Sequence, residues 1–190
     1  MNFLEERILK DGHVRPGNIL KVDSFLNHQI DVSVLDQIGE AFYNKYGSCG
    51  ITRILTIESS GIAIAALTAR YFKVPFVFAK KAKSKNIDGD VFTSRVHSYT
   101  YDKDYDITLS KKYLGPSDKV LIIDDFLANG EAATGAIRLL RKAHATVGGI
   151  GILIEKAFQP GHDKLVSQGF DVYSLARIGH MSADHIEFIE

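Results

Sequence analysis

Apolar side chains recur along this chain in two patterns that predict different elements. An unbroken aliphatic run at residues 120–123 has no polar alternation, which predicts a strand buried on both faces of a parallel sheet, with helices on each side. Residues 33–47 instead carry apolar side chains at helical spacing, from a capping-box-like start at residues 33–36 to a stop at Gly47. The inward residues of that helix are Val34, Leu35, Ile38, Phe42 and Tyr46. Together these patterns indicate an α/β fold.

The same criteria predict the remaining elements. Strands are expected at residues 53–57, 76–79, 147–154 and 171–176, helices at residues 62–72, 131–143 and between Asn2 and Gly12, and an edge element at residues 181–190. In the helix at 131–143, Ala136, Ile137 and Leu140 face inward, and Arg138, Arg141 and Lys142 face water. Residues 19–30 mix apolar and amide side chains, which is typical of an irregular surface segment or of a segment folded over a ligand.

Length and charge narrow the class of protein. At 190 residues the chain suits one well-buried domain, spanning residues 1–190. The 23 basic and 23 acidic side chains balance, so there is no electrostatic footprint for nucleic acid or an anionic membrane. No apolar run is long enough to span a bilayer, and early acidic residues argue against a signal peptide, so a cytoplasmic protein is expected. Cys49 is the only cysteine and the seven histidines are scattered, so neither an intrachain disulfide nor a protein metal site is predicted.

Chemistry-bearing residues follow the aliphatic run directly. Asp124 and Asp125 come at the carboxyl end of the predicted strand, where open α/β sheets bind their ligands, and Ala128, Asn129 and Gly130 lead into a helix. Small residues let backbone N–H groups approach an anion at the helix N-terminus, while adjacent carboxylates accept hydrogen bonds from vicinal hydroxyls. A sugar phosphate would satisfy both features. An isolated aliphatic–Asp–Asp stretch fits equally well an ordinary strand with a polar, solubilising end.

This segment resembles the ribose-diphosphate loop of the type I phosphoribosyltransferases. Asn129 and Ala132 stand where that family usually has threonine, and Ile-Asp-Asp-Phe-Leu-Ala-Asn-Gly-x-Ala is how the loop reads in the bacterial xanthine phosphoribosyltransferases. The resemblance implies that Asp124 and Asp125 contact the ribose without a covalent role. It further implies that the 5′-phosphate of 5-phosphoribosyl 1-diphosphate is bound, mainly by backbone N–H groups, at Ala128, Asn129, Gly130, Glu131 and Ala132.

Two further stretches resemble the xanthine enzymes. Residues 20–31 resemble their hood, where the positions matching Leu20 and Asn27 contact the purine. Ile-Glu-Lys-x-Phe-Gln-Pro-Gly, at residues 154–161, implies that Lys156 donates to a purine oxygen. From the residues alone, Lys156 is equally consistent with a solvated loop charge. The implied architecture is a single type I phosphoribosyltransferase domain, with a mostly parallel central sheet flanked by helices, a hood from about residues 1–32 plus C-terminal elements, and a flexible loop at about residues 80–105.

Two weaker candidates for pyrophosphate binding also come from the resemblance. Ser59, Ser60 and Gly61 follow the strand at 53–57 and repeat the strand–turn–helix geometry, although such a turn is usually only a helix cap. Lys81 belongs to a basic stretch with Lys80, Lys83 and Lys85, and a charge run is usually a solvated face. Because strand-like alternation follows at residues 95–101, this stretch is predicted to lie on the exposed limb or tip of a long, mobile hairpin.

The implied activity is transfer of phosphoribose from 5-phosphoribosyl 1-diphosphate to xanthine in purine salvage. The resemblance also implies Mg²⁺ carried with the diphosphate substrate and a homodimeric assembly. Two alternatives stay open: a guanine or hypoxanthine phosphoribosyltransferase, and a non-catalytic nucleotide-sensing regulator on the same fold. Such regulators commonly add a DNA-binding domain, for which this chain has neither the spare length nor a basic stripe.

Overall fold

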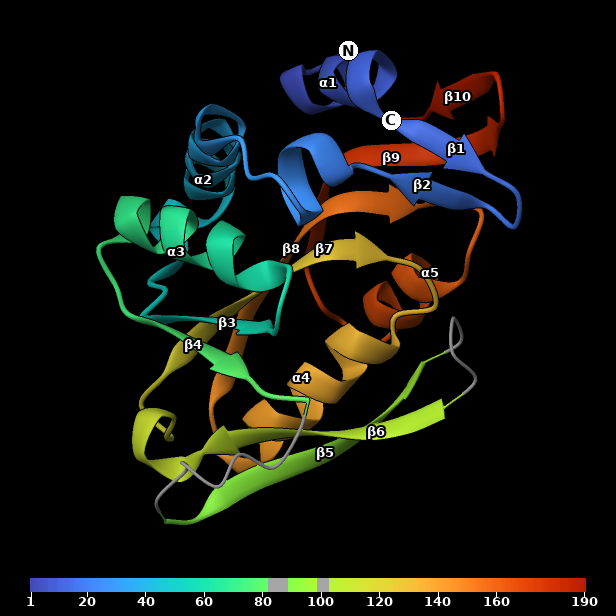
Figure 1. Ribbon diagram of the computed structural model, residues 1–190. Coiled ribbons are helices and arrows are strands. Elements are labelled where there is room, and N and C mark those ends of the chain that lie inside the picture. Colours follow the sequence, from blue (N-terminus) through green and yellow to red (C-terminus); the bar gives the residue numbers. More distant parts are fainter. Residues whose placement is uncertain (82–88, 99–102) are drawn as a thin grey trace.

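A central sheet runs through the computed structural model, which describes residues 1–81, 89–98 and 103–190 (Figure 1). In this part of the chain, six strands pair in the order β10–β9–β8–β7–β3–β4. Their bounds are β3 Arg53–Ile57, β4 Phe76–Ala79, β7 Lys119–Leu127, β8 Thr146–Lys156, β9 Val172–Ser182 and β10 His185–Phe188. The pairs from β9 to β4 are parallel, and β10 adds an antiparallel edge. The predicted mostly parallel sheet is therefore confirmed.

Helices cover both faces of this sheet (Figure 1). On one side lie α1 Phe3–Asp11, α2 Val32–Tyr46 and α3 Gly61–Phe72, and on the other lie α4 Glu131–Lys142 and α5 Gly161–Val166. β7 shows how the sequence produces these layers, because Leu121 and Ile123 enter the first core whereas Val120 and Ile122 enter the second. These four side chains are at most 2% exposed. The unbroken aliphatic run is thus buried on both faces, as predicted.

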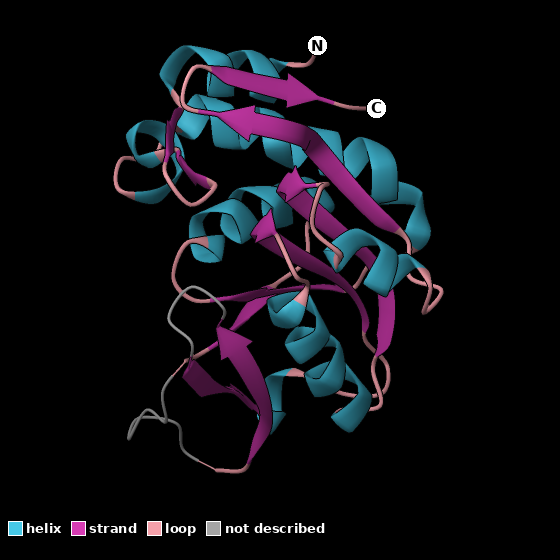
Figure 2. Ribbon diagram, turned by 90° about the vertical axis from the view of Figure 1, so that its right-hand side faces the viewer, coloured by secondary structure: helices cyan, strands magenta, loops and turns pink. Residues whose placement is uncertain are grey.

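Two antiparallel hairpins stand apart from the central sheet. β5 Val91–Ser98 and β6 Lys103–Ser110 pair with each other and pack on α4, at the end of the molecule opposite both termini (Figures 1 and 2). Gly135 of α4 allows this contact, since a Cβ there would lie 2.4 Å from Val96 Cγ2. β1 His13–Arg15 and β2 Ile19–Lys21 form the second hairpin. The short turns are η1 Asp23–Asn27, η2 Gly47–Cys49 and η3 Lys111–Tyr113.

Several boundaries differ from the sequence predictions. α2 begins at Val32, before the predicted start at residues 33–36, because the Asp31 side chain accepts hydrogen bonds from Ser33 N (3.0 Å) and Val34 N (3.4 Å) and caps the helix there. β8 and β9 continue past their predicted ends. Arg138 was predicted to face water, but its Nε donates to Ser94 Oγ on β5 at 3.0 Å. β1, β2 and α5 were missed, because three to six residues are too few to establish a period.

The basic stretch was predicted to form the exposed limb or tip of a long, mobile hairpin together with residues 95–101. A hairpin is present, but it pairs β5 with the following β6, from Val91–Ser110 to Ser98–Lys103. Lys80 and Lys81 precede this hairpin and are neither its limb nor its tip, so that part of the prediction is wrong. Lys80 and Lys81 are described, whereas Lys83 and Lys85 fall in residues 82–88, outside the described residues. Residues 99–102 also lie outside the described part of the chain. The prediction that residues 80–105 act as a flexible loop therefore stays a prediction.

Candidate active site

The chain reverses its direction of progress across the sheet between β3 and β7. After β3 it crosses through α3 to β4 on one side, and after β7 it crosses through α4 to β8 on the other. The segments that leave β3 and β7 therefore diverge. The carboxyl ends of two such strands border the crevice in which open α/β sheets bind ligands. Residues 58–61 and residues 124–132 both lie at this crevice.

Asp124 and Asp125 lie on β7 at the edge of the crevice. β7 continues to Leu127, so both carboxylates belong to the strand and do not follow it. The last residue pair between β3 and β7 is Leu55–Ile122, and both aspartates lie beyond it. Each carboxylate accepts a hydrogen bond from the backbone amide of the next residue. Asp125 N donates to Asp124 Oδ1 and Phe126 N donates to Asp125 Oδ1, both at 3.0 Å. Asp124 lines the cleft described below, whereas Asp125 is not among the described residues that line it.

The start of α4 has the geometry of an anion cradle. Its N-cap is Gly130, with φ of +77°, a conformation that side-chain-bearing residues rarely adopt. No side chain caps this helix end, so its first-turn amides are available to an anion. Thr134 Oγ donates back to Gly130 O at 2.7 Å and tightens the turn. The binding of a 5′-phosphate at Ala128 to Ala132 stays a prediction, to which this geometry gives a physical basis.

α5 packs directly against this cradle. Gly161 N donates to Ala128 O at 3.0 Å, and a Cβ on Gly161 would lie only 2.3 Å from that oxygen. One turn later, Lys164 Nζ contacts Glu131 Oε1 at 2.5 Å. A backbone hydrogen bond and an ion pair therefore fasten the cradle to α5. Pro160-Gly161 gave no local sign of this contact, because the partner segment lies about thirty residues earlier.

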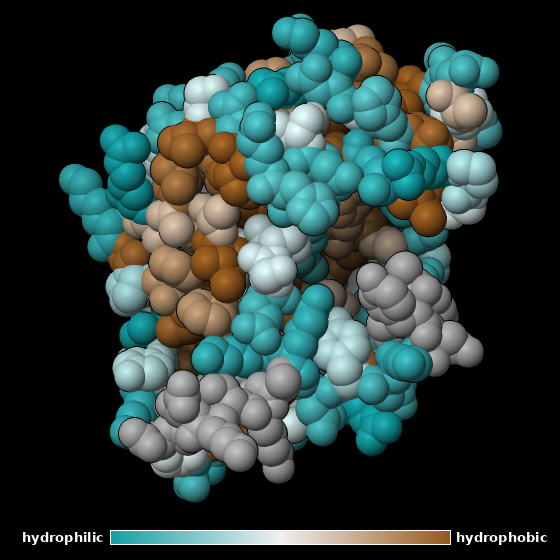
Figure 3. Space-filling view, viewed as in Figure 1, coloured by the Kyte–Doolittle hydropathy of each residue, from teal (hydrophilic) through white to brown (hydrophobic). Residues whose placement is uncertain are grey.

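A cleft of about 480 Å³ opens over the cradle. Seven predicted site residues line it: Asp124, Ala128, Asn129, Gly130, Glu131, Ala132 and Lys156. The cleft is also lined by residues that were not predicted from the sequence: Gly17, Asn18, Ile19, His97, Tyr105, Phe126 and Gln159. These come from the β1–β2 turn, from β5 and β6, and from the segments flanking the cradle. Figure 3 shows a hollow on this side of the molecule, below the N-terminal hairpin.

Lys156 and Phe126 lie together in the cleft. Lys156 Nζ is 5.9 Å from the centroid of the Phe126 ring and donates to Asn18 O at 2.8 Å, in the turn between β1 and β2. Burial lowers the pKa of the Lys156 ammonium, because the charged form loses hydration. A flat apolar ring beside a partly dehydrated cation suits a planar ligand that carries oxygen acceptors or a negative charge.

Comparison with known proteins identifies the family. A family model for the phosphoribosyl transferase domain matches residues 26–178. The chain belongs to the phosphoribosyltransferase family. Its type I phosphoribosyltransferase fold, predicted from the sequence, is thereby confirmed.

Curated relatives carry a more specific name. Xanthine phosphoribosyltransferase of Agathobacter rectalis is 55% identical over 190 residues, which is all of this chain and 99% of that protein. Xanthine phosphoribosyltransferase 1 of Clostridium botulinum is 53% identical over the whole of both chains. Xanthine phosphoribosyltransferase of Streptococcus pneumoniae is 50% identical over all of this chain and 98% of its own.

Solved structures resemble this chain in fold. The adenine phosphoribosyltransferase of Giardia lamblia, in complex with 9-deazaadenine, matches 95% of this chain and all of its own with a TM-score of 0.80 at 24% identity. The adenine enzyme of Trypanosoma brucei, in complex with AMP, pyrophosphate and ribose-5-phosphate, matches 92% of this chain and 79% of its own with a TM-score of 0.77 at 20% identity. At these identities the likeness concerns the fold alone.

A buried carboxylate holds the Lys156 side of this phosphoribosyltransferase cleft. Glu155 is 0% exposed, and its oxygens accept hydrogen bonds from Ser174 Oγ (2.5 Å) and Arg177 Nε (3.1 Å) and contact His162 Nδ1 (2.9 Å). These partners come from β9 and α5. Glu155 therefore ties the strand that presents Lys156 to the helix that fastens the cradle, and charged groups so deeply buried are found almost only when they are paired in this way.

Asp124 is the most perturbed acid of the cleft. Burial raises its pKa well above the ordinary value, and the neighbouring Asp125 carboxylate raises it further. The positive charge of Lys81 acts in the opposite direction, so this side chain lies close enough to influence Asp124. Burial raises the pKa of Tyr105, and the charge of Asp124 adds to that shift. Asp124 thus ionises readily only when a hydrogen-bond donor or a cation joins it, which a sugar hydroxyl or a metal-bearing substrate would supply.

The raised pKa of Asp124 predicts that Asp124→Asn stabilises the free protein at neutral pH. At pH values below about 3.9 both the folded and the unfolded chain hold this proton. As the pH rises through the raised native pKa, the folded state loses stability because it holds the proton more tightly than the unfolded chain. The asparagine variant should therefore melt at a higher temperature than wild type at pH 8, with a difference that shrinks toward pH 4. In a domain of this size the melting temperature rises by roughly 2–4 °C for each kcal/mol added to the free energy of unfolding.

Differential scanning calorimetry between pH 4 and pH 8 checks this expectation. Asp106→Asn is the matched control, because Asp106 is exposed on β6 and its neutralisation should leave the melting temperature nearly unchanged. A variant at Asp124 that melts below wild type at pH 8 would contradict the buried, destabilising carboxylate.

The second candidate cradle lies after β3, on the other side of the crevice. Ser60 is the N-cap of α3 but makes no side-chain capping hydrogen bond, so simple capping does not account for this turn. Gly61 has a packing role, since a Cβ there would lie 1.8 Å from Thr56 Oγ1. Lys81 N donates to the adjacent Glu58 Oε1 at 2.7 Å, and its Nζ lies 5.6 Å from the Tyr105 ring centroid. The assignment of Ser59, Ser60, Gly61 and Lys81 to pyrophosphate stays a prediction.

Two predicted base contacts lie away from the cleft wall. Leu20 is 6% exposed inside the core of the N-terminal region, and Asn27 is exposed at the end of η1. Neither is among the described residues that line the cleft. The same β1–β2–η1 segment does reach the cleft, through Gly17, Asn18 and Ile19. Contact of Leu20 and Asn27 with a base therefore stays a prediction that requires this segment to close on the ligand.

Within the described residues, no group of three or more His, Cys, Asp or Glu side chains is arranged to hold a metal ion. In the same residues, no helix is both long enough and apolar enough to cross a bilayer.

Proposed function

We propose that this chain transfers the phosphoribosyl group of 5-phosphoribosyl 1-diphosphate to xanthine, which yields xanthosine 5′-monophosphate and pyrophosphate in purine salvage. The observation that carries the proposal is one cleft that combines an open helix N-terminus, an acidic strand end and Lys156 beside Phe126. Three relatives that bear the name xanthine phosphoribosyltransferase, at 50–55% identity over the whole chain, support the same base.

The sugar phosphate occupies the cradle end of the cleft. Backbone amides of Ala128 to Ala132 bind the 5′-phosphate, and the field of α4 favours its charge. Asp124 and Asp125 accept hydrogen bonds from the vicinal ribose hydroxyls. These donors stabilise the ionised form of Asp124, which burial and the neighbouring Asp125 disfavour through a raised pKa. The diphosphate is bound with its own Mg²⁺ beside the β3 turn, where Ser59 to Gly61 and Lys81 contribute amides and positive charge.

The base occupies the other end. Phe126 offers a flat apolar surface, and Lys156 donates to the 6-oxo group of the purine. Asn27 donates its amide NH₂ to the 2-oxo group of xanthine, with Leu20 as an apolar wall. This placement requires residues 1–32, together with the C-terminal strands, to act as a hood that closes over the base.

Catalysis in this arrangement needs no covalent bond to the protein. As the C–O bond to pyrophosphate breaks and pyrophosphate leaves with its electron pair, positive charge develops at the anomeric carbon. The nitrogen of ionised xanthine, which has already released its proton to water, attacks from the opposite face. Asp124 and Asp125 lie near the ribose and stabilise that charge, while lysine and backbone amides stabilise the departing anion. The cradle and the base pocket hold the two substrates in line and exclude water that would hydrolyse the activated sugar. We place this reaction in the cytoplasm and in a homodimer.

A four-purine assay tests the base assignment. We expect the highest kcat/KM with xanthine, lower values with guanine and hypoxanthine, and no turnover of adenine, whose 6-amino group meets the donor Lys156. Hypoxanthine leaves the Asn27 donor unpaired, which costs about 1–3 kcal/mol, or roughly five- to a hundredfold in kcat/KM. Asn27→Ala should therefore reduce the preference for xanthine over hypoxanthine.

Asn44→Ala is the matched control, because Asn44 is an exposed amide on α2, remote from the base pocket, and should leave the ranking of bases unchanged. A wild-type preference for hypoxanthine, or an unchanged ranking in Asn27→Ala, would overturn the base assignment. Release of pyrophosphate in the same assay distinguishes the enzyme from a nucleotide-sensing regulator, which would bind 5-phosphoribosyl 1-diphosphate without turnover.

A further inference from the structure

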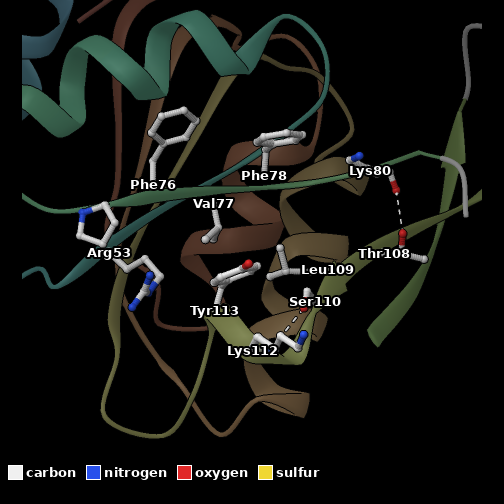
Figure 4. A pocket seen from close by; sticks show the side chains of 11 residues that line it. Arg53, Phe76, Val77, Phe78, Lys80, Thr108, Leu109, Ser110, Lys112 and Tyr113 are labelled. Carbon is white, nitrogen blue, oxygen red and sulfur yellow. Dashed lines mark hydrogen bonds between the residues drawn. The ribbon is translucent and has the colours of Figure 1, made fainter. Parts of the chain in front are cut away.

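A second cavity lies outside the catalytic cleft, at the β4 edge of the central sheet. It has a volume of about 450 Å³, close to the 480 Å³ of the cleft that we assign to a sugar phosphate and a base. Its walls come from β4, from the end of β6 and from η3 (Figure 4). A nucleotide-sized ligand fits a space of this volume, which lies within the range of ordinary ligand pockets, about 300–1,000 Å³.

The lining combines aromatic rings with positive charge. Phe76, Phe78 and Tyr113 supply three rings, and Figure 4 shows Tyr113 facing β4 from the opposite wall. Tyr113 is 58% exposed, which leaves one side of its ring free for contact. Aromatic rings of this kind stack on nucleobases, with about 1–3 kcal/mol for each base in stacking contacts elsewhere.

Three cations border the same space, with Arg53 and Lys80 at opposite ends and Lys112 in η3 (Figure 4). Arg53 is partly neutralised, because its Nε pairs with Asp118 Oδ1 at 3.1 Å. Lys80 and Lys112 have no ion pair with any described residue, and no carboxylate is among the described residues that line the cavity. The cavity therefore keeps net positive charge that a phosphate would neutralise.

We propose that this cavity binds a nucleoside phosphate, with the base against the aromatic rings and the phosphate at Lys112 and Lys80. The two kinds of lining residue carry the proposal together. A purely apolar ligand would leave the cations unused, and a bare phosphate would make no use of the rings. Hydroxyl groups of Ser110 and Tyr113 are available to the sugar or the base.

The walls of this cavity continue into the catalytic cleft. β4 leads directly to Lys80 and Lys81, and β6 carries Tyr105, which lines the cleft. The two walls are joined where Lys80 N donates to Thr108 O (2.9 Å) and Thr108 N donates to Lys80 O (2.8 Å). A ligand bound between β4 and η3 would therefore contact the same two segments that border the substrates.

Isothermal titration with ADP tests the site. The catalytic cleft is expected to reject adenine, so ADP should report the second cavity, with a dissociation constant below about 1 mM, or roughly 4 kcal/mol of binding free energy. The double variant Lys112→Glu/Tyr113→Ala should bind ADP about tenfold more weakly or worse. Both side chains are exposed, so this variant should fold normally. Lys10→Glu, an exposed lysine on α1, is the charge-matched control and should bind as wild type does.

Gly130→Val separates the two sites, because it disrupts the catalytic cradle and should leave ADP binding unchanged. Adenosine, which lacks the phosphate half of the ligand, should bind at least about tenfold more weakly than ADP. The proposal is overturned if wild type shows no binding at ADP concentrations several times higher than about 1 mM. It is equally overturned if binding is lost in Gly130→Val and kept in the double variant, or if adenosine binds as tightly as ADP. Binding that is kept in Gly130→Val and weakened in the double variant assigns ADP to the second cavity, whichever purine the catalytic cleft accepts.

Discussion

Gly130→Val is expected to lower kcat/KM for 5-phosphoribosyl 1-diphosphate by about a hundredfold or more. Gly130 has φ of +77°, and a β-branched residue there is strained by about 1–3 kcal/mol. The added Cβ would also lie 3.2 Å from Gly161 Cα and 3.4 Å from Gly161 O, so the loop must move away from α5. Displacement of a binding group by about 1 Å is enough for a hundredfold loss. Steady-state kinetics and titration calorimetry with the Mg²⁺ complex of the substrate measure the effect.

Glu131→Gln provides the comparison for this variant. It changes the charge of the neighbouring residue but keeps an oxygen that can accept from Lys164 Nζ, and it leaves the backbone amides in place. We therefore expect a change within about threefold, because the pair with Lys164 is partly accessible to solvent and the glutamine keeps its hydrogen bond. Circular dichroism should show that both variants are folded. Near-normal substrate affinity in the valine variant would contradict the assignment of the phosphate to this loop.

Lys156→Met should reduce kcat/KM for xanthine by about tenfold to a hundredfold, the usual worth of a hydrogen bond to a charged group. The loss with hypoxanthine should be smaller, because xanthine ionises more readily near neutral pH and the positive Lys156 favours that anion. Burial lowers the pKa of Lys156 in the free protein, and an anionic base beside it would raise that pKa again. The ratio of xanthine to hypoxanthine efficiency should therefore fall in this variant. Initial rates with both bases between pH 6 and pH 9 measure it.

Lys10→Met serves as the control for Lys156→Met, since it removes an exposed lysine of α1 that lies outside the cleft lining. Its kinetics should match wild type. If Lys156→Met keeps the full preference for xanthine, the oxygen of the purine is recognised elsewhere, and the role given to the end of β8 is wrong.

The sequence predicted best those elements that are long enough to show a repeating pattern of apolar residues. α2 carries five inward side chains over four turns, and β7 is apolar on both faces, so their burial followed directly from spacing. The first residue of α2 was misplaced because Asp31 outcompeted Ser33 for the capping role, although both are good caps. Local spacing could not distinguish them. α5 was missed because its six residues give less than two turns.

Only those cleft residues that belong to a recognisable local stretch of sequence could be predicted. Asp124, the 128–132 loop and Lys156 were found because each follows a recognisable strand or resembles a family motif. Phe126 and Tyr105 were not predicted as cleft residues. An aromatic residue on a strand is expected to lie in the hydrophobic core unless the fold shows that it borders a cleft. The β1–β2 turn reaches Lys156 across 138 residues of sequence, a contact that no local pattern encodes. Non-local pairing, not chemistry, set the limit of the prediction.

The contacts between α5 and the 128–131 loop have a consequence for how the substrate is received. Gly161 N on Ala128 O and Lys164 on Glu131 form from the protein's own groups. The loop is therefore shaped during folding, and its loss of backbone freedom does not have to accompany the arrival of each substrate molecule. Hydrogen exchange of the Gly161 amide, which donates to Ala128 O, should accordingly be slow before any ligand is added and change little on binding. The β1–β2 turn and η1, if they close over the base, take up the ordering that binding still requires.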